Sequence, residues 1–373
     1  MSKPSWRRSD ARVLVEQQTL RQSWDALNLG PPEVPFLSAA AVVAALQNLG
    51  QGTEQLVWAE VGGRVAFMAV LVPQDRWRWS SYQPSQIPLG CWVADRSLPL
   101  QAWAQALLHS GCLGFPLSVS LTQADPLRWA RQQDSAQDFH EDYVNTAWLD
   151  IEGTFDTYWA QRGKNLRQNL RKQRNKLASD NIVTTLKVWR RPEEVAAAIG
   201  RYGAMESLGW KSDQGTAIHP DNAQGRFYTQ LLAEAASQGQ TLITEYCFND
   251  QPVAMNLGLL SAGTWVVLKT TYDETVSKTL SPSSLLREEE LQLLFAGELP
   301  VKRIEYYGRV MDWHTKLTVQ QRSLYHLTRY RWAWLKQLAL KRRRRSSAAP
   351  EPTPASTSAP APGTEPQLKA DAP

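Results

Sequence analysis

The sequence predicts an α/β (α+β) protein made of two similar units, each with a mixed central sheet flanked by helices. Strand-like apolar runs alternate with amphipathic helical stretches along the chain. Two apolar hairpin patterns, at 56–72 and 241–261, recur about 190 residues apart. In each pattern a two-residue turn is followed by Val-Ala and a second apolar strand. This recurrence indicates that one α/β unit is present twice.

Composition limits the class of protein. The chain has 373 residues, 43% of them hydrophobic, which is enough for two domains with cores of their own. It contains no run of eighteen apolar residues and no apolar stretch of signal-peptide type near its start, so we expect a cytoplasmic protein. Cys91, Cys112 and Cys247 are too scattered for a disulfide framework or a zinc site, so we expect no metal.

The basic charge is concentrated near the C-terminus. The net charge is +5, but residues 329–345 carry eight Lys or Arg and no acid, which leaves 1–328 close to neutral. Nucleic-acid binding through overall charge is therefore not expected. Residues 329–345 predict a basic amphipathic helix that either docks on the body or lies on an anionic membrane surface. The Pro- and Ala-rich tail at 346–373 is predicted to be disordered.

The first unit is predicted to span residues 1–150. A helix at 35–50 has Ser38 as its expected cap and Gly50 as its expected end. The hairpin around Gly62-Gly63 follows. The other elements expected here are a helix at 99–111 and strands at 115–122 and 140–151.

The second unit, residues 151–328, is predicted to open with a long helix at 155–177. One stripe of this helix is apolar: Phe155, Trp159, Leu166, Leu170 and Leu177. The other faces are basic: Arg162, Lys164, Arg167, Arg171, Lys172, Arg174 and Lys176. No acid interrupts residues 157–179, so this is either a solvated basic face or a surface with an anionic neighbour.

A strand at 264–271, a polar loop and a leucine-rich helix starting near Pro282 form the most informative stretch. A helix start offers unsatisfied backbone N–H groups and a partial positive charge, where phosphates bind. Ser283 and Ser284 would offer such donors, whereas simple capping explains Ser281 equally well. The stretch lacks the glycines of a phosphate-binding loop or a dinucleotide fingerprint, which argues against an NTPase or a dehydrogenase.

Three ordered groups of residues in the second unit carry a family resemblance. They are Glu206-Ser207-Leu208-Gly209-Trp210-Lys211 with Phe227-Tyr228; Val267-Leu268-Lys269 with Tyr272-Asp273-Glu274 and Ser281-Pro282; and Tyr306-Tyr307-Gly308 followed by Lys316. Over residues 150–320 this set resembles the BioF2-like acetyltransferase domain, also called the CelD/BcsL-type group. That group is a branch of the GNAT superfamily and is related to the Fem peptidyltransferases. The N-terminal half resembles it more weakly.

The resemblance implies a tandem GNAT-like fold in which a splayed sheet holds acetyl-CoA or another acyl-CoA as co-substrate, with no permanently bound cofactor. The pyrophosphate would lie on the helix that begins near Pro282. The implied donor-binding residues are Ser281, Ser283, Ser284 and Leu285. Members usually have glycine where this chain has Ser283, which restricts the backbone there.

The implied reaction is acyl transfer from a thioester to an amine. An alkylammonium is protonated at neutral pH, so a base must take its proton. Glu206 and Asp273 are the predicted bases, with a surface residue paired to Arg201 as the alternative for Glu206 and a turn residue as the alternative for Asp273. The predicted substrate-binding residues are Trp210, Lys211, Lys269, Tyr272 and Lys316, and core packing is the alternative for Trp210.

The acceptor is the least defined part of this prediction. Relatives of the group are associated with exopolysaccharide or envelope assembly, which implies an amino sugar or a lipid-linked glycan at the cytoplasmic membrane face. One rival hypothesis is a Fem-like enzyme that uses aminoacyl-tRNA, the only case in which nucleic acid would be a partner. The other is a non-catalytic GNAT-like scaffold. The oligomeric state stays open.

Overall fold

The computed structural model describes residues 4–207 and 218–347. Within this part of the chain, thirteen strands join in one mixed sheet with the order β1-β2-β3-β4-β6-β13-β7-β12-β11-β10-β9-β8, and β5 pairs with β3. The strands are β1 Ser5–Asp10, β2 Gln55–Val61, β3 Arg64–Pro73, β4 Arg78–Ser81, β5 Trp92–Ala94, β6 Ser118–Ala124, β7 Asp138–Asp150, β8 Thr184–Trp189, β9 Thr241–Phe248, β10 Gln251–Ser261, β11 Thr264–Tyr272, β12 Arg303–Glu305 and β13 Gln321–Tyr330.

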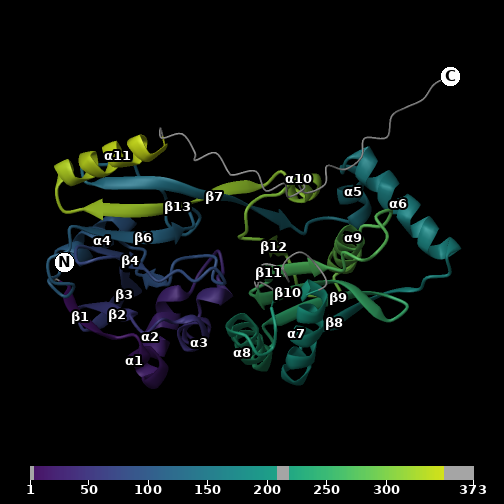
Figure 1. Ribbon diagram of the computed structural model, residues 1–373, viewed down its shortest axis with the longest axis horizontal. Coiled ribbons are helices and arrows are strands. Elements are labelled where there is room, and N and C mark those ends of the chain that lie inside the picture. Colours follow the sequence, from purple (N-terminus) through teal and green to yellow (C-terminus); the bar gives the residue numbers. More distant parts are fainter. Residues whose placement is uncertain (1–3, 208–217, 348–373) are drawn as a thin grey trace, which may run out of the picture.

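The predicted repeat is confirmed by the strand pairing. From one end of the sheet, β1, β2, β3 and β4 are antiparallel neighbours and β6 adds in parallel to β4. From the other end, β8, β9, β10 and β11 repeat this pattern and β12 adds in parallel to β11. The two copies form the left and right halves of Figure 1.

The two repeated hairpins follow from the chemistry of their turns. Gly62 and Gly63 have φ values of 59° and 78°, and Asn249 and Asp250 have φ values of 49° and 66°. Two-residue turns that match the twist of antiparallel strands need positive φ at both positions, which Gly, Asn and Asp adopt most readily. The hairpins predicted around both dipeptides are therefore confirmed.

Helices cover both faces of the sheet. The helical segments, in chain order, are α1 Arg12–Glu16, α2 Gln18–Asn28, the 3-10 turn η1 Pro35–Leu37, α3 Ala39–Leu49, α4 Leu100–Leu108, α5 Phe155–Ala160, α6 Lys164–Ser179, α7 Pro192–Ser207, α8 Ala223–Ser237, α9 Pro282–Phe295, α10 Asp312–Leu317 and α11 Ala333–Ser347. Ser38 caps α3 as predicted, because its side chain accepts a hydrogen bond from the Ala41 N–H.

Two of the predicted helices differ in extent. The single helix expected at 155–177 is two helices, α5 and α6, because the chain leaves the helical conformation before Gly163 and Arg162 donates to the Leu317 carbonyl. The basic helix expected at 329–345 begins only at Ala333, because β13 continues to Tyr330.

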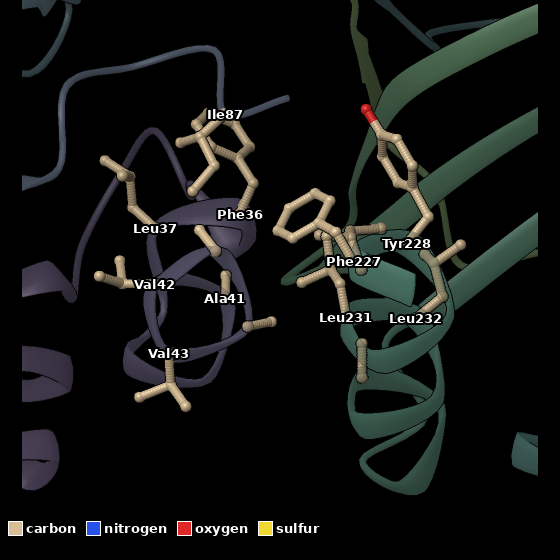
Figure 2. Packing of buried hydrophobic residues seen from close by; sticks show 14 of the residues in the cluster. Phe36, Leu37, Ala41, Val42, Val43, Ile87, Phe227, Tyr228, Leu231 and Leu232 are labelled. Atoms are coloured by element: carbon tan, nitrogen blue, oxygen red, sulfur yellow. The ribbon is translucent and has the colours of Figure 1, made fainter. Parts of the chain in front are cut away.

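One apolar core joins the two halves. It contains residues of α1, α2 and α3 from the first half and of α7 and α8 from the second. Figure 2 shows Phe36 and Phe227 facing each other across this contact, whereas Tyr228 points away from it. Side-chain amides add to the contact, since Asn48 donates to Gln230 at 2.7 Å. The opposite face of the second half carries α5, α6 and α9 in two further clusters.

The long strands β7 and β13 lie between the two copies, and a buried charge cluster holds them there. The Arg322 guanidinium on β13 donates to Asp125 at 2.8 and 2.9 Å and to Glu305 at 3.0 Å. Tyr307 donates to Asp125 at 2.9 Å. Asp125 follows β6 of the first half, whereas Glu305 ends β12 of the second, so the cluster connects both copies. Burial raises the pKa of Glu305 to about 7, although Arg322 opposes the shift.

β13 also bears on the predicted domain boundaries. It follows the second unit in sequence, yet it pairs with β6 and β7. The division into 1–150 and 151–328 stays a prediction. Residues 321–330, most of which this prediction places in the second unit, complete the sheet beside strands of the first unit.

We expect Arg322→Met to lower the free energy of unfolding by about 3–5 kcal/mol, because Asp125 and Glu305 would stay buried without their counter-charge. Urea unfolding of the full chain measures this change. The matched control is Arg191→Met, which breaks a pair whose arginine is 70% exposed and should leave stability almost unchanged. Equal effects of the two substitutions would contradict a central role for the cluster.

Candidate functional site

The sheet opens where β11 and β12 part. These parallel strands pair only through Thr264, Trp265 and Val266 of β11, which face Arg303, Ile304 and Glu305 of β12. β11 then continues to Tyr272 without β12 beside it. A small cleft lies at the parting point. It is lined by Asn256, Trp265, Val267, Thr270, Arg287, Glu290, Leu291, Ile304, Tyr306, Trp313 and Leu317.

A bulge shapes β11 at the same level. Leu257 of β10 pairs with Lys269, but the next residue, Gly258, pairs with Val267. Leu268 is therefore the extra residue, and a bulge of this kind turns backbone groups away from the regular ladder. Among the described residues no strand pairs with this edge of β11 beyond Val266, so the edge offers backbone donors and acceptors to a ligand in the cleft.

The predicted donor-binding residues form the start of α9. Pro282 occupies the first turn, where no N–H is needed. The Ser281 N–H donates to Gln173 at 2.8 Å, and the Ser281 side chain makes no capping bond. The Ser284 and Leu285 N–H groups both donate to the Ser281 carbonyl. The Leu285 side chain is buried in the core beneath α6 and α9.

Ser283 is the residue best placed to meet an anion. Within the described residues its N–H has no hydrogen-bond acceptor, and its side chain is half-buried in the first turn. A helix start with such a donor attracts negative charge. Serine at position 283, where the resembled group usually has glycine, therefore keeps the backbone N–H as a donor.

Arg287 lies one turn further along α9. Its guanidinium stacks on the Trp313 ring at 3.7 Å from the ring centroid and donates to the Ser283 carbonyl at 3.1 Å. Tyr306, which follows β12, packs edge-on against Trp313 at 5.2 Å. A cation and two aromatic rings thus form the wall of the cleft on the side of α10.

A polar cluster lies at the bottom of the cleft. Glu290 on α9 is buried, and its Oε1 accepts from the Asn256 amide at 2.7 Å and from the Thr244 hydroxyl. Burial raises the pKa of Glu290 to about 7, although these two hydrogen bonds oppose the shift. Two of these residues lie on the central strands β9 and β10, so the cluster fixes α9 to the sheet.

Glu206 lies on the opposite face of the sheet, near the end of α7. Its side chain is 2% exposed. It accepts a hydrogen bond from the Ile218 N–H at 2.8 Å and from the Tyr202 hydroxyl at 3.4 Å. The alternative of a surface residue paired with Arg201 is wrong, because Glu206 is buried and Arg201 pairs with Glu245 at 2.6 Å.

Tyr228 links Glu206 to β11. Burial raises the pKa of Tyr228 well above its ordinary value, and the Glu206 charge adds to the shift. The Lys269 ammonium lies over the Tyr228 ring at 5.9 Å. Of the predicted site residues, Lys269 therefore lies over this tyrosine, and the Glu206 charge acts on it.

The other predicted residues are more dispersed. Asp273 accepts bonds from the Thr275 N–H and hydroxyl at 2.8 and 2.6 Å, as a turn residue does. Tyr272 is exposed at the end of β11, and Lys316 is exposed on α10. Trp210 and Lys211 lie outside the described residues.

Three polar residues of the cleft were not predicted. Asn256 interrupts the apolar run of β10, which is the signal that singles it out. Glu290 lies on the same helical face as Leu286 and Leu294, so its burial follows from the 3.6-residue period. The sequence around Arg287 gives no comparable signal. An arginine among the charged residues of a helix is usually interpreted as part of a solvated face.

The equivalent opening in the first half is filled. Ser81 at the end of β4 bonds to Thr122 of β6 at 2.6 Å, so side chains continue to bridge these strands. Trp92 of β5 also donates to the Thr122 carbonyl at 3.1 Å. Side chains thus bridge the parallel strands of the first half, and a void of about 10 Å³ lies beyond them at the end of β6, lined by Trp92, Gln123 and Asp125.

No group of three His, Cys, Asp or Glu side chains in the described residues could hold a metal ion. No helix among these residues is long and apolar enough to cross a membrane.

Comparison with known families agrees with this geometry. Residues 164–315 match the acetyltransferase (GNAT) domain. The matched stretch runs from α6 to α10 and includes the open cleft, the start of α9 and Glu206. The finer BioF2-like assignment stays a prediction. Among the curated proteins, none matches the sequence.

Solved structures share the fold over most of the chain. The C-terminal DUF2156 domain of a protein described as a lysylphosphatidylglycerol synthetase from Agrobacterium fabrum is 13% identical, with a TM-score of 0.52 over 89% of this chain and 96% of its own. FemX is 10% identical, with a TM-score of 0.51 over 85% and 98%. A protein of unknown function from Bacteroides thetaiotaomicron is 10% identical, with a TM-score of 0.51 over 84% and 98%. The chain therefore shares the fold of these structures over most of its length, and residues 164–315 are the part that matches the GNAT domain.

Proposed function

We propose that this chain is an N-acyltransferase that moves an acyl group, acetyl in the simplest case, from acyl-CoA to an amine. The observation that carries the proposal is the parting of β11 and β12 beside the start of α9. The pantetheine arm would follow the unpaired edge of β11, and the pyrophosphate would meet the Ser283 N–H at the positive end of the helix. Arg287, one turn further on, adds a positive charge.

In the proposed reaction the amine nitrogen attacks the thioester carbonyl carbon, the C–S bond breaks, and CoA leaves as the thiolate. Glu206 takes the proton of the amine, directly or through a water, and the thiolate is protonated in turn. The backbone at the Leu268 bulge would stabilise the developing oxyanion. Glu206 is preferred to Asp273 because it lies within the buried part of the second half, whereas Asp273 lies in a turn beyond the end of β11.

We further propose an amino sugar or an envelope or exopolysaccharide precursor as the acceptor. It would approach the face of the sheet that carries α7 and α8, where the Tyr202 hydroxyl donates to Glu206 and the Lys269 ammonium lies over the Tyr228 ring. The predicted roles of Trp210, Lys211, Tyr272 and Lys316 in acceptor binding stay part of this proposal.

A Fem-like, aminoacyl-tRNA-dependent reaction is a second candidate, and one observation favours it. Among the described residues, Lys164, Arg167, Arg171 and Lys172 of α6 have no acidic partner, whereas Arg174 and Lys176 do. Such a basic face suits RNA phosphates. RNA that copurifies with the chain and dissociates in high salt would support this candidate, and its absence together with acyl-CoA binding would exclude it.

We expect Ser283→Asp to weaken acetyl-CoA binding at least tenfold in calorimetric titration of the full chain. A carboxylate in the first turn stabilises the helix, so α9 should stay folded, but it repels the pyrophosphate. Thr53→Asp is the matched control, because it adds the same charge on an exposed loop of the first half. Equal affinities in the two variants would contradict the proposed pyrophosphate position. A wild-type chain that binds no acyl-CoA would favour the scaffold or tRNA hypotheses.

We expect Glu206→Gln to lower the rate of amine-dependent CoA release roughly 100- to 10,000-fold, the range lost with a general base, while acetyl-CoA affinity stays unchanged. The assay follows free thiol from acetyl-CoA with a panel of amino sugars. Asp273→Asn should have a much smaller effect. If Asp273→Asn removes activity and Glu206→Gln retains it, the assignment of the base is wrong.

We also propose that α11 places the protein on an anionic membrane surface. Lys336 is buried and donates to the Ser135 and Asp138 carbonyls, so the inner face of α11 docks on the body. The outer side presents Trp332, Trp334 and Leu338, which are 41%, 59% and 41% exposed. Phe115, 55% exposed, packs beside Trp332 at 6.0 Å. Tryptophan with nearby Lys and Arg suits the interface of a bilayer.

Sedimentation of the full chain with vesicles tests this surface. We expect binding to vesicles that contain phosphatidylglycerol, weaker binding to phosphatidylcholine alone, and loss of binding in the variant Trp332→Ser with Trp334→Ser. The control is Met311→Ser with Val319→Ser, which removes exposed apolar groups elsewhere. Equal recovery of wild type and both variants in the supernatant would refute the membrane contact.

A further inference from the structure

Asn256 brings an unusual polar group into the cleft. It lies in the middle of the apolar strand β10 and is 3% exposed. Its Nδ2 donates to Glu290, but its Oδ1 is buried and has no partner among the described residues. Most buried polar atoms in folded proteins have a partner, because an unpaired one costs free energy. Asn256 Oδ1 is therefore an acceptor that suits a ligand.

The surroundings of Asn256 restrict which ligand group can reach it. The walls at the parting point combine the apolar side chains of Trp265, Val267 and Ile304 with the polar side chains of Thr270 and Tyr306 and the Arg287 guanidinium. The space between them, about 10 Å³, holds one water-sized group. The group must reach this point from the gap between β11 and β12, which is where the thioester end of an acyl-CoA would lie.

Charge decides between a hydroxyl and an ammonium. Glu290 accepts two hydrogen bonds through Oε1, and burial raises its pKa to about 7, so near neutral pH it carries only part of a negative charge. Arg287 lines the same cleft and is permanently charged. A cationic group on the ligand would therefore meet a guanidinium and no full counter-charge. A neutral hydroxyl can donate to Asn256 Oδ1 without that repulsion.

We propose that this pocket selects an acyl-CoA whose acyl chain carries a hydroxyl group, which donates a hydrogen bond to Asn256 Oδ1. The proposal rests on the proposed function, since it needs acyl-CoA in the β11–β12 cleft. It names the donor class: a short hydroxyacyl group in preference to plain acetyl. The transfer reaction itself is unchanged, and the hydroxyl takes no part in it.

Calorimetric titration of the full chain with matched donors tests the proposal. The probes are CoA itself, propionyl-CoA against lactoyl-CoA, and butyryl-CoA against 3-hydroxybutyryl-CoA. We expect at least one hydroxyacyl donor to bind ten- to a hundredfold more tightly than its partner without the hydroxyl, because a site built for a donor rejects an analogue that lacks it. In Asn256→Leu this preference should disappear, so that each hydroxyacyl donor and its partner without the hydroxyl bind with equal affinity.

The possible results separate this inference from the proposed function. If CoA binds and each hydroxyacyl donor binds no more tightly than its partner, the hydroxyacyl proposal is wrong and the proposed function stands. If no CoA compound binds, the proposed function fails first. If Asn256→Leu also loses CoA binding, the affinities of the matched donors for the wild-type chain still decide whether the pocket prefers a hydroxyacyl group. A preference that persists in Asn256→Leu would show that Asn256 is not its source.

Discussion

Arg322 holds the molecule together at the point where its two halves meet. The two copies of the α/β unit would each end in an unpaired parallel strand, β6 in one and β12 in the other. β13 and β7 fill the space between them, and Arg322 neutralises a carboxylate from each side. Removing two carboxylates and a guanidinium from water is unfavourable unless their hydrogen bonds are satisfied, and here the geometry satisfies them. The arrangement of the halves therefore depends on this contact.

The same contact sets the geometry of the cleft. The Tyr307 hydroxyl donates to Asp125. The Tyr307 backbone has a φ of 50°, a conformation that residues other than glycine seldom adopt. The preceding residue, Tyr306, then lines the cleft and packs against Trp313. One side of the open site is thus fixed to the charge cluster. The first half has the same strand pattern, but side chains and β5 fill its opening. Among the described residues, side chains bridge the opening of the first half, and the second half carries the proposed donor site.

Local chemistry made much of the fold predictable from the sequence. The turn dipeptides at 62–63 and 249–250, the Ser38 cap and the start of α9 at Pro282 all depend on neighbours in the chain. The position of β13 was not predictable in this way, because its partners are distant: Arg322 meets Asp125 across 197 residues. The start of α9 and Glu206 could be located from motifs. Arg287 and the Asn256–Glu290 pair could not, since their role comes from helix α9 packing on strands far from it in sequence.

Hydrogen–deuterium exchange of the full chain with and without acetyl-CoA is the most direct test of a single donor site in the second half. The account predicts slower exchange of the backbone amides at 267–285, which include the free edge of β11 and the start of α9. It predicts no change at 78–108, where the first half has its filled equivalent. Protection at 78–108, or no protection at 267–285 while acetyl-CoA is bound, would contradict it.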